Sequence, residues 1–392
     1  GSTLANQAFI FALGQPGDKV AVSRTAHRSV LSALVLAGLE PIWMSPEIDS
    51  ATGVPIGIAV TELQRALAEK PIVILLTEPG YLGTISDLPA LIKVAHQQKV
   101  PVILDAAWGG HFGFHPQLPK HAFQMGADAL ITSTHKALPG YSASALLLAR
   151  TELLSAERLE QSFETTHTTS PAGAPLASID GVRALLETRG EELLGQLLEN
   201  IHRFKETVQA EFPLPIFLYP SDFPAGRFDP SKLVLRVQQL GASGVDIEED
   251  LQQQGIRVEM ADRDTIVFLA TIADTAAYFE RLADVLIPIL KKRQEQRRES
   301  ATALSWSVIP QKATSMRDAY FAKTEMVDAK NAVGRISADL IAPYPPGVAV
   351  VAPGEVLTEQ IVSGLQASRA AGVRIAYATD STLAGFRVVT SS

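Results

Sequence analysis

The sequence contains no cysteine among its 392 residues. This absence excludes disulfide bonds, zinc sites built from thiolates, iron–sulfur clusters and a cysteine nucleophile. No apolar run reaches the roughly 18 residues that are needed to span a bilayer. The N-terminus also lacks the basic region followed by an apolar one that marks a signal peptide. We therefore expect a soluble, cytoplasmic protein that does not associate with a membrane.

Positive charge is also scarce, because 34 lysines and arginines face 42 acidic residues and leave a net charge of −8. That balance argues against a nucleic-acid-binding protein and is compatible with a cationic substrate. Apolar residues make up 46% of the chain and charged residues 19%, which is an ordinary globular composition. A chain of this length can bury a large core, and we expect two or three domains.

The first half of the chain alternates apolar strands with helical patterns. Strands are predicted at 19–23, 41–44, 72–76, 101–105, 129–131 and 144–148, and helices at 4–13, 29–38, 61–69 and from an Asp87 cap to about 98. Such alternation is typical of an α/β fold in which helices cover both faces of a mostly parallel sheet. We assign residues 1–178 to this large domain.

The second half of the chain has a different pattern. A loop is predicted at 160–175, where Thr, Ser, Pro and Gly are enriched, followed by a long helix over about 179–212 with breaks near Gly190 and Gly195. That helix is expected to connect to a small α+β domain, the two together spanning 179–300. Further strands are predicted there at 233–237, 256–260 and 265–269, with helices at 245–254 and 275–290. Residues 307–392 are predicted to form a C-terminal domain of turns and short strands.

A lysine and an aspartate follow two of the predicted strands. Lys136 closes the segment Ser133-Thr134-His135-Lys136, and Asp105 ends its strand ahead of a glycine-rich loop that carries Trp108 and His111. Open α/β sheets bind ligands at the carboxyl ends of their strands. Pyridoxal 5'-phosphate (PLP) needs a lysine for its Schiff base and an acid that keeps its pyridine nitrogen protonated. The pair favours a PLP site, although a Ser-x-His-Lys segment alone is also common in surface loops.

Two further segments have both a functional and an ordinary interpretation. Gly1-Ser2-Thr3 opens a helix with free backbone N–H groups and two hydroxyls, which suits a phosphate but is also a common helix cap. His111 and His115 have a spacing that a metal site could use. The residues between them indicate a loop, and no third ligand has suitable spacing, so we expect no metal.

In their order along the chain, these segments resemble the Orn/Lys/Arg decarboxylase family, the bacterial type with the aspartate-aminotransferase fold (fold type I). The resemblance rests on Gly1-Ser2-Thr3-x-x-Asn6, Ala26-His27-Arg28-Ser29-Val30, Tyr81-x-Gly83-x-x-Ser86-Asp87-Leu88, 105–115, Ser133-Thr134-His135-Lys136, Thr168-Thr169-Ser170-Pro171, Tyr344-Pro345-Pro346-Gly347 and Pro353-Gly354-Glu355. It implies PLP-dependent decarboxylation of arginine, lysine or ornithine to the amine and CO₂. It also implies a homodimer or larger homo-oligomer with a role in polyamine biosynthesis.

The resemblance implies a catalytic role for four residues. Lys136 would form the Schiff base with PLP, and Asp105 would pair with the pyridine nitrogen and keep it charged. His27 would stack on the cofactor ring, although it could instead be a histidine at the edge of the core. His135, next to the lysine, would lie near the phosphate or the substrate.

Six more positions receive a binding role from the same resemblance. Ser2, Thr3 and Ser133 would hold the phosphate of PLP. Ala107 and Trp108 would pack around its ring, and Trp108 could equally serve packing alone. A separate acid, Glu355, would recognise the basic side chain of the substrate, with a plain turn residue as the alternative.

The sequence also departs from the family pattern. Family members usually begin well before the Gly1-Ser2-Thr3 helix, so the N-terminal part of the family's large domain is expected to be missing. A glutamine usually stands where this chain has Ala143, and Ser-Tyr usually stands at Ala172-Gly173. Two alternatives therefore stay open. One is another PLP reaction on this fold, such as an aminotransferase or lyase, and the other is a catalytically silent family member.

Overall fold

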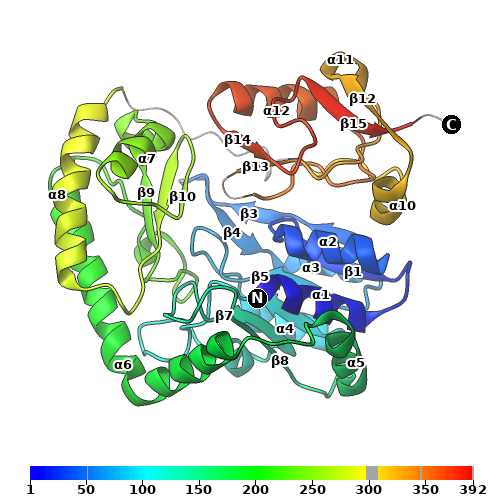
Figure 1. Ribbon diagram of the computed structural model, residues 1–392, viewed down its shortest axis with the longest axis horizontal. Coiled ribbons are helices and arrows are strands. Elements are labelled where there is room, and N and C mark those ends of the chain that lie inside the picture. The colour runs from blue at the N-terminus through cyan, green and yellow to red at the C-terminus, as the bar shows by residue number, and fades with distance from the viewer. Residues whose placement is uncertain (51, 297–307, 345–346, 391–392) are drawn as a thin grey trace.

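The computed structural model describes residues 1–50, 52–296, 308–344 and 347–390. Figure 1 shows a central sheet with its helices, a smaller sheet beside α7 and α8, and a C-terminal group of elements around α12. The predicted boundary between the second and third domains falls at 300–307, outside the described residues. Pro345 and Pro346 of the Tyr-Pro-Pro-Gly segment also lie outside them.

The central sheet has six strands in the order β2-β1-β5-β6-β7-β8. The strands are β1 Lys19–Ser23, β2 Glu40–Met44, β5 Ile74–Thr77, β6 Val102–Asp105, β7 Ala129–Ser133 and β8 Ala145–Ala149. All neighbours pair in parallel except β7 with β8. The predicted, mostly parallel sheet is confirmed, and the carboxyl ends of β1, β5, β6 and β7 therefore share one edge.

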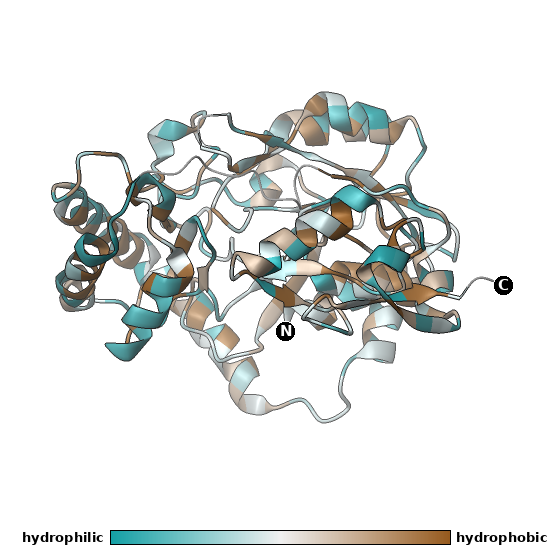
Figure 2. Ribbon diagram, turned by 90° about the horizontal axis from the view of Figure 1, so that it is seen from above, coloured by the Kyte–Doolittle hydropathy of each residue, from teal (hydrophilic) through white to brown (hydrophobic). Residues whose placement is uncertain are grey.

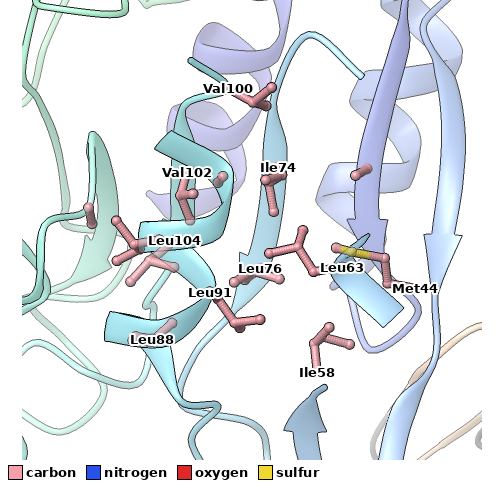
Figure 3. Packing of buried hydrophobic residues seen from close by; sticks show 14 of the residues in the cluster. Met44, Ile58, Leu63, Ile74, Leu76, Leu88, Leu91, Val100, Val102 and Leu104 are labelled. Atoms are coloured by element: carbon pink, nitrogen blue, oxygen red, sulfur yellow. The ribbon is translucent and has the colours of Figure 1, made fainter. Parts of the chain in front are cut away.

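Helices cover both faces of this sheet, as the sequence predicts. They are α1 Ser2–Leu13, α2 Arg28–Ala37, α3 Val60–Leu67 and α4 Leu88–Gln97. Apolar side chains of α3 and α4 pack on one face, where Leu63 and Leu91 meet Leu76 and Leu104 (Figure 3). The apolar side chains of α1 and α2 pack on the other face. There they meet the strand residues that alternate in sequence with those facing α3 and α4. The Asp87 cap is also confirmed.

Two predictions about the middle of the chain are wrong. Most of the predicted loop at 160–175 is helical, because α5 (Ala156–Thr166) and α6 (Gly173–Gln209) leave only 167–172 between them. The α6 helix is also continuous through Gly190 and Gly195. A Cβ at Gly195 would lie 3.2 Å from Nε2 of His115, so close packing accounts for this glycine better than a helix break.

The smaller sheet has the order β10-β11-β9 and is antiparallel. Its elements are β9 Leu233–Arg236, α7 Gly244–Gln253, β10 Met260–Ala261, β11 Thr265–Phe268 and α8 Ala276–Arg293. The strand predicted at 256–260 shortens to β10, although the Glu259 N–H still donates to the Val267 carbonyl. The second half of α6 and α8 enclose a separate apolar core with these strands.

The C-terminal region contains more helix than the sequence pattern indicates. Its elements are α10 Met316–Phe321, β12 Thr324–Asp328, α11 Ala329–Ala332, β13 Ala342–Tyr344, α12 Glu359–Ala370, β14 Arg374–Ala376 and β15 Gly385–Val389. Earlier in the chain, a hairpin of β3 (Pro46–Ile48) and β4 (Pro55–Ile58) was not predicted either. Short 3-10 helices occur at Ala122–Met125, Pro220–Asp222 and Val237–Leu240.

Hydropathy along the helices follows this packing. In Figure 2, teal hydrophilic and brown hydrophobic residues alternate along several helices, as expected where one face of a helix is buried. Within the described ranges, no helix has both the length and the apolar character that a membrane crossing requires.

Candidate active site

The sheet edge brings Lys136 and Asp105 together, since β6 and β7 are neighbours and Asp105 pairs in register with Ile131. Lys136 follows the end of β7, and its Nζ lies 4.4 Å from the ring centroid of Trp108. Burial lowers the pKa of the Lys136 amine below its usual value, and the charges of Asp105 and Glu259 oppose this effect. A lowered pKa makes a lysine amine more available as a nucleophile.

A chain of hydrogen bonds fixes the Asp105 carboxylate. Asn6 on α1 donates from Nδ2 to Oδ2 of Asp105 over 2.9 Å and to Oγ of Ser29 over 3.0 Å. The Ser29 hydroxyl in turn hydrogen-bonds Nδ1 of His27 over 2.8 Å. Residues of α1 and α2 therefore hold one buried carboxylate in a defined orientation. The sequence motif includes Asn6 and Ser29, but sequence reasoning assigns neither a role.

His27 lies before α2 and caps it, because its side chain accepts a hydrogen bond from the Ser29 N–H. Burial lowers the pKa of His27, Asp105 opposes that shift, and Lys136 and Arg28 add to it. A neutral imidazole is thus favoured beside the carboxylate and the lysine. The structure places His27 at the same sheet edge as its predicted partners.

The residues predicted to hold a phosphate lie around the start of α1 and the end of β7. Ser2 and Thr3 form the first turn of α1, and a Cβ on Gly1 would lie 3.1 Å from the carbonyl oxygen of Ala143, in the loop after Lys136. Ser133 is buried, and its Oγ has no hydrogen-bond partner in the part of the chain that the structure describes.

His135, Ala107 and Trp108 also lie in the two loops at this edge. Nδ1 of His135 donates to the Ser144 carbonyl over 2.7 Å. Ala107 and Trp108 are both buried, and the Ala107 N–H donates to Oδ1 of Asp105 over 3.3 Å. The Trp108 ring forms an apolar wall beside Lys136.

The structure contradicts the substrate role predicted for Glu355. Its two carboxylate oxygens accept hydrogen bonds from Arg24 over 2.7 and 2.9 Å, and the Ala352 N–H donates to the second oxygen. Both side chains of the ion pair are almost completely buried. The carboxylate therefore joins the C-terminal region to the segment after β1 and is not free to bind a substrate.

His111, one of the two histidines with metal-like spacing, belongs to a buried polar cluster. Its Nε2 lies 2.9 Å from Oγ of Ser231 and 3.3 Å from the Asp229 carboxylate. This cluster joins the loop after β6 to the segment that precedes β9. Among the described residues, no group of three His, Cys, Asp or Glu side chains is arranged to hold a metal ion.

Two charged residues of the smaller domain also reach this region, and sequence reasoning missed both. Nζ of Lys232 lies 3.5 Å from the ring centroid of Trp108. Glu259 acts electrostatically on Lys136, on Lys232 and on Tyr344 of the C-terminal region. No local sequence pattern marks either residue, because their relation to Lys136 arises only when the domains pack together.

Comparison with known proteins agrees with this arrangement. The model of the Orn/Lys/Arg decarboxylase major domain matches residues 1–217, and that of the Orn/Lys/Arg decarboxylase C-terminal domain matches 294–375. The chain belongs to the Orn/Lys/Arg decarboxylase family. The arginine decarboxylase of Bacillus subtilis (strain 168) is 34% identical over 398 residues, covering 99% of this chain and 81% of the relative. This family member is thus a decarboxylase, a carbon–carbon lyase.

Solved structures confirm the predicted fold of this decarboxylase. The lysine decarboxylase LdcF of Francisella novicida matches 100% of this chain and 69% of its own with a TM-score of 0.82 at 20% identity. A structure of SPT with PLP matches 74% of this chain and 71% of its own with a TM-score of 0.58 at 15% identity. The fold is therefore that of the fold type I PLP-dependent enzymes.

Proposed function

We propose that this decarboxylase uses PLP and acts on a basic amino acid, namely arginine, lysine or ornithine, releasing CO₂ and the corresponding amine. The observation that carries the proposal is the convergence of Lys136, Asp105 and His27 at one sheet edge. The family is named for the same three substrates, and its B. subtilis relative is an arginine decarboxylase.

The residues present fit PLP. The hydroxyls of Ser133 and of Tyr81, on which Asp105 acts electrostatically, are both buried without a hydrogen-bond partner among the described residues. This state is unfavourable, and a polar ligand would relieve it. Lys136 would hold the cofactor covalently, Asp105 would pair with its ring nitrogen and His27 would stack on the ring. The groups that would face its phosphate are Ser2, Thr3, Ser133 and His135.

PLP, when bound, supplies an electron sink for the electron pair left on Cα as CO₂ departs. The protein's part is orientation and electrostatics. Asn6 holds one oxygen of Asp105 in place, so the carboxylate needs no reorientation during the reaction. Because burial lowers the pKa of Lys136, its amine releases a proton more readily than an exposed lysine does. The Trp108 ring covers one side of the amine.

A direct assay tests the proposal. The purified chain is loaded with PLP and incubated in parallel with arginine, lysine and ornithine, while CO₂ and amine are measured. We expect a yellow protein and release of both products from at least one substrate. A yellow protein that releases CO₂ from none of the three would disprove the substrate class. A chain that takes up no PLP would disprove the cofactor.

Glu259 is our candidate for recognition of the basic side chain, in place of Glu355. Its charge acts on Lys136 and on Tyr344, so it is near both the amine and the C-terminal region. We expect Glu259→Gln to raise the KM of the basic amino acid by about tenfold or more, the usual worth of a hydrogen bond to a charged group. Glu249→Gln, an exposed change on α7, is the control. An unchanged KM in both variants would remove this role.

We also propose that the chain acts as a homodimer or larger homo-oligomer. Large apolar side chains are exposed, with Tyr141 61%, Phe163 49% and Leu176 56% accessible. They lie on the loop after Lys136, on α5 and on the start of α6. Sedimentation velocity measures the assembly directly, and a monomer at assay concentration would refute the proposal.

A further inference from the structure

Two lysines from different parts of the chain meet on one indole ring. Nζ of Lys136 lies 4.4 Å from the Trp108 ring centroid, and Nζ of Lys232 lies 3.5 Å from it. Lys136 comes from the loop after β7 in the large domain, whereas Lys232 immediately precedes β9 in the smaller domain. The second lysine therefore reaches the site across the boundary between the two sheets.

The Lys232 amine is buried without a hydrogen-bond partner. The residue is 5% exposed, and its Nζ has no acceptor among the residues that the structure describes. Burial lowers the pKa of Lys232 to about 8, Lys136 adds to the shift, and Asp229 and Glu259 oppose it. The amine therefore remains mostly protonated at neutral pH. A buried ammonium whose N–H donors are unused is unfavourable, even with the Trp108 ring and the Asp229 charge nearby, so a ligand that accepts these hydrogen bonds is expected.

A second buried lysine of the same domain shows the contrast. Nζ of Lys205 donates to the carbonyl oxygens of Leu218 and Lys232 over 3.0 and 3.1 Å. Burial also lowers the pKa of Lys205 to about 8, yet its hydrogen bonds account for its place in the fold. Lys232 has no such bonds, so a purely structural role explains it poorly.

The position of Lys232 is fixed from both sides. A Cβ on Gly83, in the loop after β5, would lie 2.5 Å from Cγ of Lys232, so this glycine leaves room for the lysine stem. The nearby Asp229 carboxylate attracts the charge of Lys232 but does not hydrogen-bond it: Oδ1 accepts from the N–H and hydroxyl of Ser231, and Oδ2 has no hydrogen-bond partner among the described residues. The ammonium is thereby held against Trp108 while its hydrogen-bonding capacity stays unused.

A PLP enzyme with an amino-acid substrate offers two anions, the cofactor phosphate and the α-carboxylate of the substrate. The proposed phosphate groups lie at the start of α1 and at Ser133, whereas Lys232 lies against the same Trp108 ring as the amine of Lys136 and interacts with it electrostatically. The amino group of the substrate must come to the place of that amine, and its α-carboxylate is only two bonds away. We propose that Lys232 binds the α-carboxylate of the amino-acid substrate and orients it for cleavage. This inference rests on the function proposed above.

The experiment compares two ligands that differ only in the carboxylate, namely the amino acid and its product amine. Dissociation constants are measured on the PLP-loaded enzyme from the change in cofactor absorbance on rapid mixing, before turnover. We expect Lys232→Met to raise the dissociation constant of the amino acid by about tenfold or more. The dissociation constant of the amine should stay within about twofold of the wild-type value. Lys232→Arg, which keeps the charge, should restore part of the lost affinity.

Lys120→Met is the control, because Lys120 is an exposed lysine that lies outside the sheet edge. It should leave the ratio of the two dissociation constants unchanged. The inference would be overturned if Lys232→Met raised the dissociation constants of both ligands equally, or raised neither. A loss confined to PLP affinity would also overturn it, since Lys232 would then serve the phosphate. If the wild-type chain releases no CO₂, the proposed function fails, while the binding ratio still tests Lys232.

Discussion

Replacing Lys136 with alanine is expected to abolish the yellow colour of the PLP-loaded protein and to lower kcat/KM by on the order of 10³-fold or more. The amine of Lys136 is the group that would join the cofactor covalently. It also lies close enough to Asp105 for the two charges to interact. Absorbance spectra of the loaded variant and a CO₂ assay measure the two effects separately.

Lys120→Ala is a suitable control for this prediction because Lys120 is exposed and lies outside the sheet edge. It should leave both the colour and the activity unchanged. A Lys136→Ala variant that stays yellow and active would contradict the assignment. Should Lys232→Met lose the colour instead, the covalent role would move to the other lysine beside Trp108.

Replacing Glu355 with alanine is expected to destabilise the fold by about 3–5 kcal/mol, because it leaves the buried charge of Arg24 without its partner. The side chains of Arg24 and Glu355 are 1% and 3% exposed. The guanidinium also donates to the Val350 carbonyl and stacks 4.5 Å from the Trp43 ring centroid. Urea unfolding of the variant and of the wild type gives the difference.

A double replacement shows whether the loss of stability comes from leaving one buried charge unpaired or from losing the ion pair itself. Arg24→Met combined with Glu355→Leu removes both charges, so it should recover much of the stability that either single change loses. The exposed pair of Arg183 and Glu187 on α6 serves as the control, and Glu187→Ala should change the unfolding midpoint little. A Glu355→Ala variant as stable as the wild type would show that the pair does not join the two regions.

Much of the large domain could be predicted from the sequence. Strand β1 has the predicted bounds of 19–23, and the predicted ends of α1 to α4 lie within two residues of those observed. These elements carry their signal locally, in short apolar runs and in caps such as Asp87. Once the strands are known to be parallel, their carboxyl ends must share an edge, which places Asp105 and Lys136 near each other.

Predictions from local sequence were wrong where a residue type occurs in more than one kind of structure. Glycines that usually end helices lie inside α6, where Gly195 lets the helix pass close to His115. Polar and small residues at 160–175 suggested a loop, yet Ser155 caps α5 and Ser162 donates to the Ala8 carbonyl on α1. Tertiary packing decided these cases against local propensity.

The sequence by itself determined the α/β class of the large domain, its strand order along the chain, and the lysine and aspartate at neighbouring strand ends. Only the tertiary structure decided that Glu355 pairs with Arg24, that Asn6 holds Asp105, and that Lys232 lies against Trp108. The physical reason is the range of the interactions. Periodicity and capping act over a few residues, whereas these contacts join segments far apart in the chain and exist only once the domains have packed.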